Sequence, residues 1–236
     1  MDRPLEDDIT PILDAWKFDP ELVNVRFLEA LDGRPLIQVR IELGILQMNR
    51  DGRPDGGVEV LQGVEDSIAS DDGFRIDSNL ATALREEAVQ VHQRYVALLT
   101  LEAYDLVVRD AMRNLRIFDL CRDRCVEPDD RKVLEQFRAQ VIATRSRAAA
   151  LAVLREGRVG EARRLLDAAV VEIRNTLASG VKEPPEIAML EGMRDILQPK
   201  LPASQRHELE RRLHGALAAE NYELAAILRD ELRQLP

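Results

Sequence analysis

The chain of 236 residues has few aromatic residues, few glycines and only two cysteines. Phe, Trp and Tyr make up 4% of it, and glycine occurs 12 times. Sheets rely on aromatic and β-branched side chains, so this scarcity argues against a protein built mainly from sheets. Two cysteines cannot form a disulfide framework. The abundance of Ala, Leu, Arg and Glu favours packed helices instead.

Long apolar runs are missing as well. No segment of the sequence approaches the roughly 18–20 apolar residues that cross a bilayer. The N-terminus begins with charged residues and has no apolar stretch of the kind found in secretion signals. We therefore expect a cytoplasmic protein without a membrane segment.

The motifs of common catalytic sites are missing too. The sequence contains no GxxxxGK[ST], GxGxxG, HExxH or GxSxG pattern. Cys121 and Cys125 lie four residues apart, but only three histidines accompany them, so we interpret both as small core residues rather than zinc ligands. The acidic runs at 5–8 and 71–72 lack an opposing base. The sequence thus predicts no enzyme, no catalytic residue, no metal and no cofactor.

Charge is distributed unevenly along the chain. The net charge is −10, and residues 1–80 hold 18 acidic against 8 basic side chains, so the remainder is neutral overall. An acidic chain offers no general electrostatic attraction for nucleic acid. Residues 138–164 hold seven arginines and two glutamates, but no aromatic residue on which a base could stack. We expect this stretch to pack against the acidic N-terminal segment, within the chain or between chains, and we do not expect nucleic acid as a partner.

Strand character is confined to the first third of the chain. Residues 23–29 and 36–43 alternate apolar and polar side chains. The apolar face of the second segment consists of Ile37, Val39, Ile41 and Leu43. The tetrapeptide Asp-Gly-Arg-Pro stands at 32–35 and again at 51–54, where glycine suits a tight turn and proline ends strand pairing. This pattern predicts a β-hairpin, with a bulge at Gly44.

From about residue 79 onwards, apolar residues recur at steps of three and four, which indicates successive amphipathic helices. We expect breaks at 102–103, 157 and 180. The sequence Glu127–Asp130, with its proline, is expected to end the second helix and begin the third. Residues 58–70 fit either a strand or a short helix.

The predicted fold class is mainly α (α+β), with a small N-terminal β-hairpin module followed by antiparallel helical hairpins. We divide the chain into four parts. Residues 1–75 form the acidic module with the β-hairpin, and 76–180 form the body of helical hairpins. Residues 181–202 are a connector in which prolines bracket a short helix, and 203–236 form a C-terminal helical hairpin.

Three turns in the helical part share one pattern, in which a polar or small break precedes an apolar residue and then a small or β-branched one. The apolar residues are Tyr104, Val159 and Tyr222, and the small or β-branched ones are Val107, Ala162 and Ala225. We expect each apolar residue to wedge against the preceding helix, and each small one to let the helix axes approach. The middle turn, from Gly157 to Ala169, resembles part of a tetratricopeptide repeat, although a generic helix pair explains it as well.

The C-terminal segment 203–236 carries the most specific pattern of the chain. Its sequence ELERRLHGALAAENYELAAILRDELRQL, at 208–235, resembles the UVR motif. That motif occurs in the excision-repair subunits UvrB and UvrC and in regulators of Clp proteases such as McsA. The matching positions are Leu209, Leu213, Ala216, Glu220, Asn221, Tyr222, Glu223, Ala225, Ala226, Leu228, Arg229, Asp230, Leu232 and Leu235. Upstream, the sequence lacks the nuclease and helicase features of the larger proteins.

The resemblance implies association with another protein, because UVR hairpins associate with one another. A hairpin of about 30 residues also buries too little surface to be stable alone. We expect Ser204 and Asn221 to cap its two helices. The predicted interaction residues are Leu209, Leu213, Ala216, Tyr222, Ala225, Ala226, Leu228, Arg229, Asp230 and Leu232. Arg229 and Asp230 form either a surface ion pair or a polar contact that sets the register of the partner.

The resulting hypothesis is a non-catalytic adaptor or scaffold that engages another protein, or a second copy of itself, through helical hairpins. The alternative is an accessory factor of nucleotide excision repair that recruits UvrB- or UvrC-like partners. Regulation of a Clp-type protease is a further alternative. Neither nucleic acid nor a membrane is an expected partner.

Overall fold

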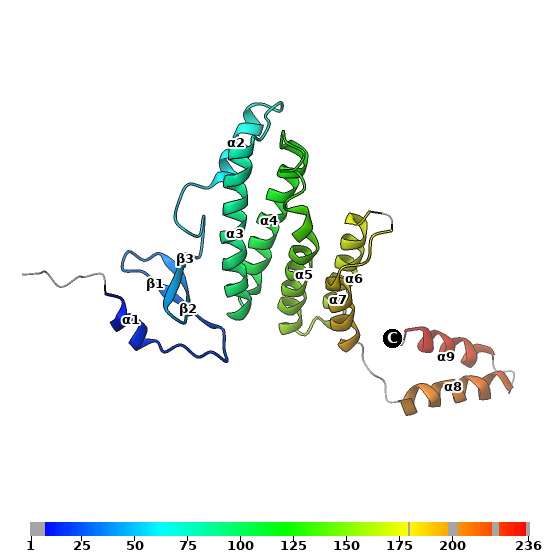
Figure 1. The fold of residues 1–236 in the computed structure, drawn as a ribbon. Coiled ribbons are helices and arrows are strands. Elements are labelled where there is room, and N and C mark those ends of the chain that lie inside the picture. Colours follow the sequence, from blue (N-terminus) through cyan, green and yellow to red (C-terminus); the bar gives the residue numbers. More distant parts are fainter. Residues whose placement is uncertain (1–7, 179, 198–202, 219–221, 235–236) are drawn as a thin grey trace, which may run out of the picture. The chain divides into compact units, whose positions relative to one another are not determined.

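The structure is a computed structural model that describes residues 8–178, 180–197, 203–218 and 222–234. It is mainly helical, with a small sheet near the N-terminus and a helical hairpin at the C-terminus (Figure 1). The predicted fold class is therefore confirmed. The chain separates into two compact units, residues 1–190 and 191–236. The finer division into four parts stays a prediction.

The N-terminal sheet has three antiparallel strands rather than the two of the predicted hairpin. A short helix precedes it, and the strands follow in the order β1-β2-β3. These elements are α1 (Thr10–Ala15), β1 (Asn24–Glu29), β2 (Pro35–Ile41) and β3 (Gly44–Asn49). The first turn places Gly33 at φ 81°, as its Asp-Gly sequence predicts.

Two details of the predicted hairpin are wrong. Gly44 is not a bulge but the first residue of β3, where it pairs with Ile41 across a tight turn. Leu43 was expected on the buried face, yet it stands in that turn and is 86% exposed. Both errors have one cause, because the chain reverses at 42–43 and the alternation of β2 stops at Ile41.

One face of the sheet packs on the helices. The cross-strand pair Ile37 and Met48 is buried in one cluster with Val91 and Leu98 of helix α3 (Ser78–Thr100). On the sheet, the guanidinium of Arg26 lies 4.0 Å from the centre of the Trp16 ring. The indole thus gains a cation–π contact beside its apolar surface.

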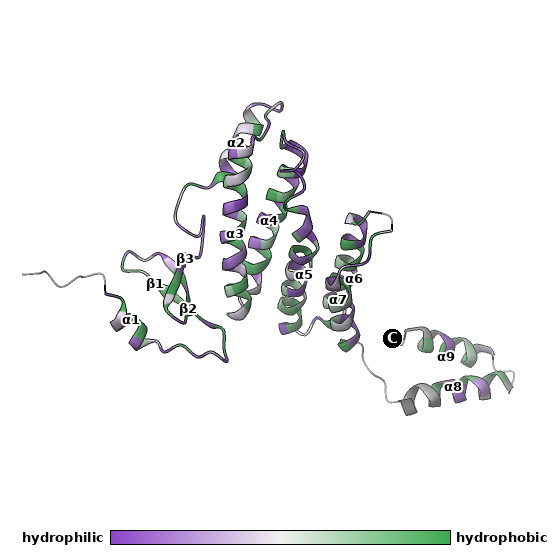
Figure 2. Cartoon of the chain, viewed as in Figure 1, coloured by the Kyte–Doolittle hydropathy of each residue, from purple (hydrophilic) through white to green (hydrophobic). Residues whose placement is uncertain are grey.

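From α2 to α6, each helix packs on the next along the chain (Figure 1). The bounds of these helices and of the one that follows them are α2 (Val60–Ser70), α3 (Ser78–Thr100), α4 (Tyr104–Arg124), α5 (Arg138–Arg155), α6 (Val159–Thr176) and α7 (Pro185–Ile196). Hydrophobic and hydrophilic residues alternate around α3 to α6, as amphipathic helices require (Figure 2). Among the described residues, no helix is both long enough and apolar enough to cross a membrane.

The ambiguous segment 58–70 is helical because another helix caps it. No side chain at the start of α2 caps its own amides. Instead, Glu87 of α3 is fully buried, and its carboxylate accepts a hydrogen bond of 2.6 Å from the N–H of Val60. Negative charge at a helix N-terminus is stabilising. Arg113 of α4 donates to the same carboxylate at 2.7 Å, so three helices meet at Glu87.

The third of the predicted amphipathic helices begins later than expected. We expected it directly after Pro128, but α5 begins at Arg138, following turns and the short 3₁₀ helix η1 (Glu135–Phe137). Val133, which would lie in a helix that began there, instead precedes α5 and is 38% exposed. The cause is tertiary, because α3 holds the chain before α5: the carboxylate of Asp130 accepts hydrogen bonds from Ser78 at 2.8 Å and from Arg85 at 2.7 Å.

Of the three similar turns found in the sequence, the two that the structure describes share one hydrogen-bond geometry. Glu102 and Gly157 occupy the left-handed region, at φ 56° and 73°. In both turns, the next residue's N–H donates at 3.0 Å to the carbonyl five residues before it. This is the Schellman arrangement, which satisfies the last carbonyls of a helix. The third turn, at 219–221, lies outside the described residues.

The arginines of α4 bind the acidic N-terminal segment. Arg109, Arg113 and Arg116 lie on one side of the helix, at i, i+4 and i+7. Their partners and distances are Asp51 at 2.6 Å for Arg109, Glu59 at 3.0 Å for Arg113 and Glu65 at 2.8 Å for Arg116. The acidic charge of the first 80 residues is thus neutralised in part by α4.

Within the chain, the expectation that the arginines of 138–164 face the acidic N-terminal segment is wrong for each of them whose ion pair the structure describes, while packing between chains stays a prediction. Arg138 pairs with Asp119 and Glu135, Arg145 with Glu172, Arg155 with Glu102, and Arg158 with Glu156 and Glu161. All these acids belong to the helical part itself. The reason is geometric, because α4 stands in the chain of packed helices between α3 and α5 and provides the arginines that meet the N-terminal acids.

Candidate protein-interaction hairpin

The C-terminal unit contains two helices that pack on each other as a hairpin, α8 (Ala203–Ala218) and α9 (Tyr222–Gln234). Its buried cluster consists of Ala216 from α8, with Ala225 and Leu228 from α9. These side chains are 5%, 5% and 2% exposed. An alanine on each helix at the contact lets the helix axes approach closely.

Five of the predicted interaction residues therefore hold the hairpin itself together. Leu209 and Leu213 are half-buried and pack against the cluster of Ala216, Ala225 and Leu228. All five come from the apolar stripe that the sequence pattern identified. Because these side chains are turned toward each other, they are not the surface that another protein would touch first.

The remaining predicted residues lie around the other sides of α9. Ala226 and Leu232 are half-buried, and Arg229 is exposed. Tyr222 is 68% exposed, so the expectation that it wedges against the preceding helix is wrong. At 100° per residue, Tyr222, Ala226 and Arg229 share one flank of α9, away from the side on which Ala225 and Leu228 face α8.

Some predicted features fall outside the part that the structure describes. These are Glu220, Asn221 and Leu235, together with the side chains of Glu223 and Asp230. The Asn221 cap and the Arg229–Asp230 pair thus stay predictions. Ser204 does not occupy the cap position, because α8 already begins at Ala203.

Three exposed apolar residues of the hairpin were not predicted as interaction residues. Leu217 is 48% exposed, Leu224 is 39% exposed and Ile227 is 59% exposed. Leu224 and Ile227 are three residues apart and share a second flank of α9. That i, i+3 spacing is visible in the sequence and could have separated them from the stripe of Ala225 and Leu228. With Tyr222, these side chains give the hairpin its apolar outer surface.

The cysteine pair is buried in the first unit. Cys121 is 1% exposed and Cys125 is fully buried. Burial raises the pKa of the Cys121 thiol to about 12, which keeps it protonated and unreactive at neutral pH. Within the described ranges, no cluster of three or more His, Cys, Asp or Glu side chains is arranged to hold a metal ion.

The comparisons with known proteins bear on this hairpin alone. The family model described as UvrB/uvrC motif matches residues 204–235, which span α8 and α9. No curated protein and no solved structure matches the chain. The match does not extend to the first unit, residues 1–190. The chain therefore contains a UvrB/uvrC motif, and the C-terminal hairpin is its structure.

Proposed function

We propose that this protein is a non-catalytic adaptor that docks on another protein through its C-terminal hairpin. One observation carries the proposal: among its described side chains, the hairpin that matches the UvrB/uvrC motif exposes more large apolar ones than it buries. Leu217, Tyr222, Leu224 and Ile227 are 39–68% exposed, whereas Leu228 is its one large side chain that is fully buried among those described. An excess of exposed over buried large apolar side chains on so small a unit favours an interaction surface.

The partner is a second helical hairpin of the same type, on another protein or on a second copy of this chain. An antiparallel helix pair presents ridges and grooves that fit another helix pair, and two such pairs form a four-helix bundle. Tyr222 is the strongest anchor, because aromatic residues dominate the binding energy of interfaces. Leu224 and Ile227 provide aliphatic contacts on the other flank of α9.

A second candidate is an accessory factor of nucleotide excision repair, in which the partner is a UvrB- or UvrC-like protein. The match of residues 204–235 to the UvrB/uvrC motif favours it. The first unit adds no support of its own, because neither the sequence nor the described structure presents a nuclease or helicase motif. Under this candidate, the hairpin surface is the same and only the identity of the partner differs.

Variants of the outer surface test the proposal better than variants of the hairpin core. Ala225→Asp would bury a charge in the cluster and unfold the hairpin, so loss of binding would be uninformative. Ile227→Asp places the charge on a side chain that is 59% exposed. Val171→Asp on α6 is the matched control, since Val171 is 56% exposed.

Self-association is measured by sedimentation of the purified full chain, and binding to purified UvrB-like, UvrC-like and Clp-regulator proteins by calorimetry. We expect Ile227→Asp and Tyr222→Ala to weaken the observed association by at least about tenfold. Val171→Asp should leave it unchanged, and circular dichroism verifies that all variants are folded. If Ile227→Asp binds as tightly as the unmodified chain, the hairpin surface is not the docking site. Binding of a UvrB- or UvrC-like protein would favour the second candidate.

A further inference from the structure

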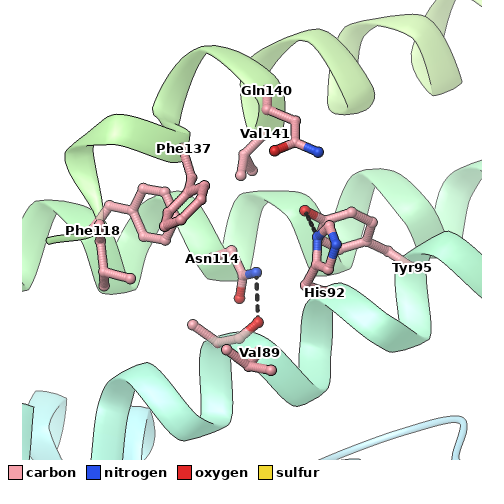
Figure 3. A pocket seen from close by; sticks show the side chains of 10 residues that line it. Val89, His92, Tyr95, Asn114, Phe118, Phe137, Gln140 and Val141 are labelled. Carbon is pink, nitrogen blue, oxygen red and sulfur yellow. Dashed lines mark hydrogen bonds between the residues drawn. The ribbon is translucent and has the colours of Figure 1, made fainter. Parts of the chain in front are cut away.

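The first unit contains a cavity of about 170 Å³ between α3, α4 and the start of α5. Figure 3 shows its walls, with Phe118 and Phe137 at one end and His92 and Tyr95 at the other. Ala88, Val89, Leu134 and Val141 complete the apolar lining. The hairpin and its proposed docking surface have no part in this cavity, so the two sites can be tested independently.

The lining of the cavity carries no formal charge. Among the described residues that form it, the polar side chains are His92, Tyr95, Asn114 and Gln140. Burial lowers the pKa of His92, so its imidazole is neutral at pH 7. Burial likewise raises the pKa of Tyr95 to about 12, which keeps the phenol protonated. An ionised ligand would lose its hydration without gaining a counter-charge, so the cavity selects uncharged molecules.

Two polar groups of the cavity partner each other. Nδ1 of His92 and the hydroxyl of Tyr95 are 2.6 Å apart, and their rings meet edge to face with centres 4.8 Å apart (Figure 3). Whichever of the two donates the proton, the oxygen of Tyr95 keeps a lone pair that can accept another hydrogen bond. The end of the cavity formed by His92 and Tyr95 thus offers a hydrogen-bond acceptor beside the apolar surface of the rings.

Asn114 adds a second acceptor. This side chain from α4 is 2% exposed, and its Nδ2 donates to the carbonyl of Ala88 at 2.9 Å (Figure 3). Its Oδ1 has no hydrogen-bond partner among the described residues. A buried acceptor without a partner is destabilising, so a donor brought to this wall by a ligand would be favoured.

We propose that this cavity binds a small uncharged aromatic molecule that carries one O–H or N–H donor, of the phenol class. The size fits, because an apolar protein cavity of about 150 Å³ accommodates one benzene ring. The ring lies among Val89, Phe118 and Val141, and its donor points to the acceptors of Asn114 and Tyr95. Aromatic walls favour such a ring through edge-to-face contacts.

Fluorine NMR of the full chain titrated with 4-fluorophenol tests the proposal, with 4-fluorotoluene and 4-fluorobenzoate as the probes that lack the donor or carry a charge. We expect saturable binding of 4-fluorophenol with a Kd of about 1 mM or tighter. The toluene should bind about fivefold more weakly, because it leaves the acceptors unpaired. The benzoate should not bind measurably.

Two variants locate the binding. Val89 lines the cavity and is 55% exposed, so Val89→Phe adds bulk at the opening without disturbing the core. It should weaken 4-fluorophenol binding by at least about tenfold. Val171→Phe on α6 has nearly the same exposure, 56%, and should leave binding unchanged. Absence of saturable phenol binding, equal affinity for the toluene, or unchanged binding in Val89→Phe would each overturn the proposal.

Discussion

Replacing Asp110 with alanine leaves the guanidinium of Arg94 buried without its counter-charge. The two side chains are each 1% exposed and form two hydrogen bonds, from Nε at 2.6 Å and from Nη2 at 2.9 Å. Removing one partner of such a buried pair costs about 3–5 kcal/mol, because the remaining charge stays desolvated. We therefore expect Asp110→Ala to lower the free energy of unfolding by roughly that amount.

The same guanidinium also holds the N-terminal segment. Nη1 of Arg94 donates to the carbonyls of Asn49 at 3.1 Å and Gly52 at 2.6 Å. Arg94→Met would leave those carbonyls without this donor and Asp110 without its main partner. In the double variant Arg94→Met/Asp110→Ala neither charge of the buried pair remains, so its cost should fall below the sum of the two single costs by at least about 1 kcal/mol.

Urea unfolding of the full chain, followed by far-ultraviolet circular dichroism, measures these costs. The free energy of unfolding falls by about 2 kcal/mol per molar urea for a chain of this kind, so Asp110→Ala should lower the midpoint of unfolding by about 2 M urea. Asp119→Ala on the same helix is the control. The carboxylate of Asp119 is 39% exposed and pairs with Arg122 and Arg138, so its loss should cost at most about 1 kcal/mol. Equal costs for the two single variants, or additive costs of the Arg94 and Asp110 variants, would refute the reasoning.

Two further predictions concern the helical part. Glu102→Gly should stabilise the chain by about 0.5–1 kcal/mol, because Glu102 stands at φ 56°, a conformation that glycine adopts at lower cost. The ion pair of Glu102 with Arg155 is exposed, so its loss costs little. Thermal unfolding measures the change, and a lower midpoint would contradict the prediction. Hydrogen bonds from Ser78 and then Arg85 hold the pKa of Asp130 below its ordinary value. The stability it contributes is thus complete above the unfolded pKa of about 3.9 and is lost as the pH falls through the lower folded value. Asp130→Asn should therefore lose less stability than the unmodified chain between about pH 5 and pH 2, and parallel losses would count against this assignment.

Local signals in the sequence predicted most of the elements. The Asp-Gly turn gave the β1–β2 hairpin, and Gly157 marked the break between α5 and α6, because both positions require a left-handed backbone that glycine adopts at low cost. Glu102 occupies the same conformation without being glycine, and there the apolar period of three and four indicated the break. These features depend on neighbouring residues, which is why a single sequence reveals them.

Elements held by distant contacts could not be read in this way. The start of α2 is capped by Glu87, which lies 27 residues further along the chain from Val60. The turns before α5 are tied to α3, because Asp130 accepts hydrogen bonds from Ser78 and Arg85, which lie 52 and 45 residues away along the chain. The cavity is a similar case, because Asn114 and Tyr95 meet only once α3 and α4 have packed. No pattern along the chain specifies these pairings.

In the C-terminal hairpin, the residues that hold the two helices together differ from the residues that are exposed to a partner. Leu209, Leu213, Ala216, Ala225 and Leu228 match the motif and form the contact between α8 and α9, so the match reports that a hairpin folds here. Under the proposed function, partner choice depends instead on side chains that the hairpin leaves exposed, Tyr222 and Ile227 foremost among them. Two proteins can then share the buried positions and differ in partner. For this reason the motif alone does not assign the chain to excision repair, and we expect the outer surface of α9 to specify the partner.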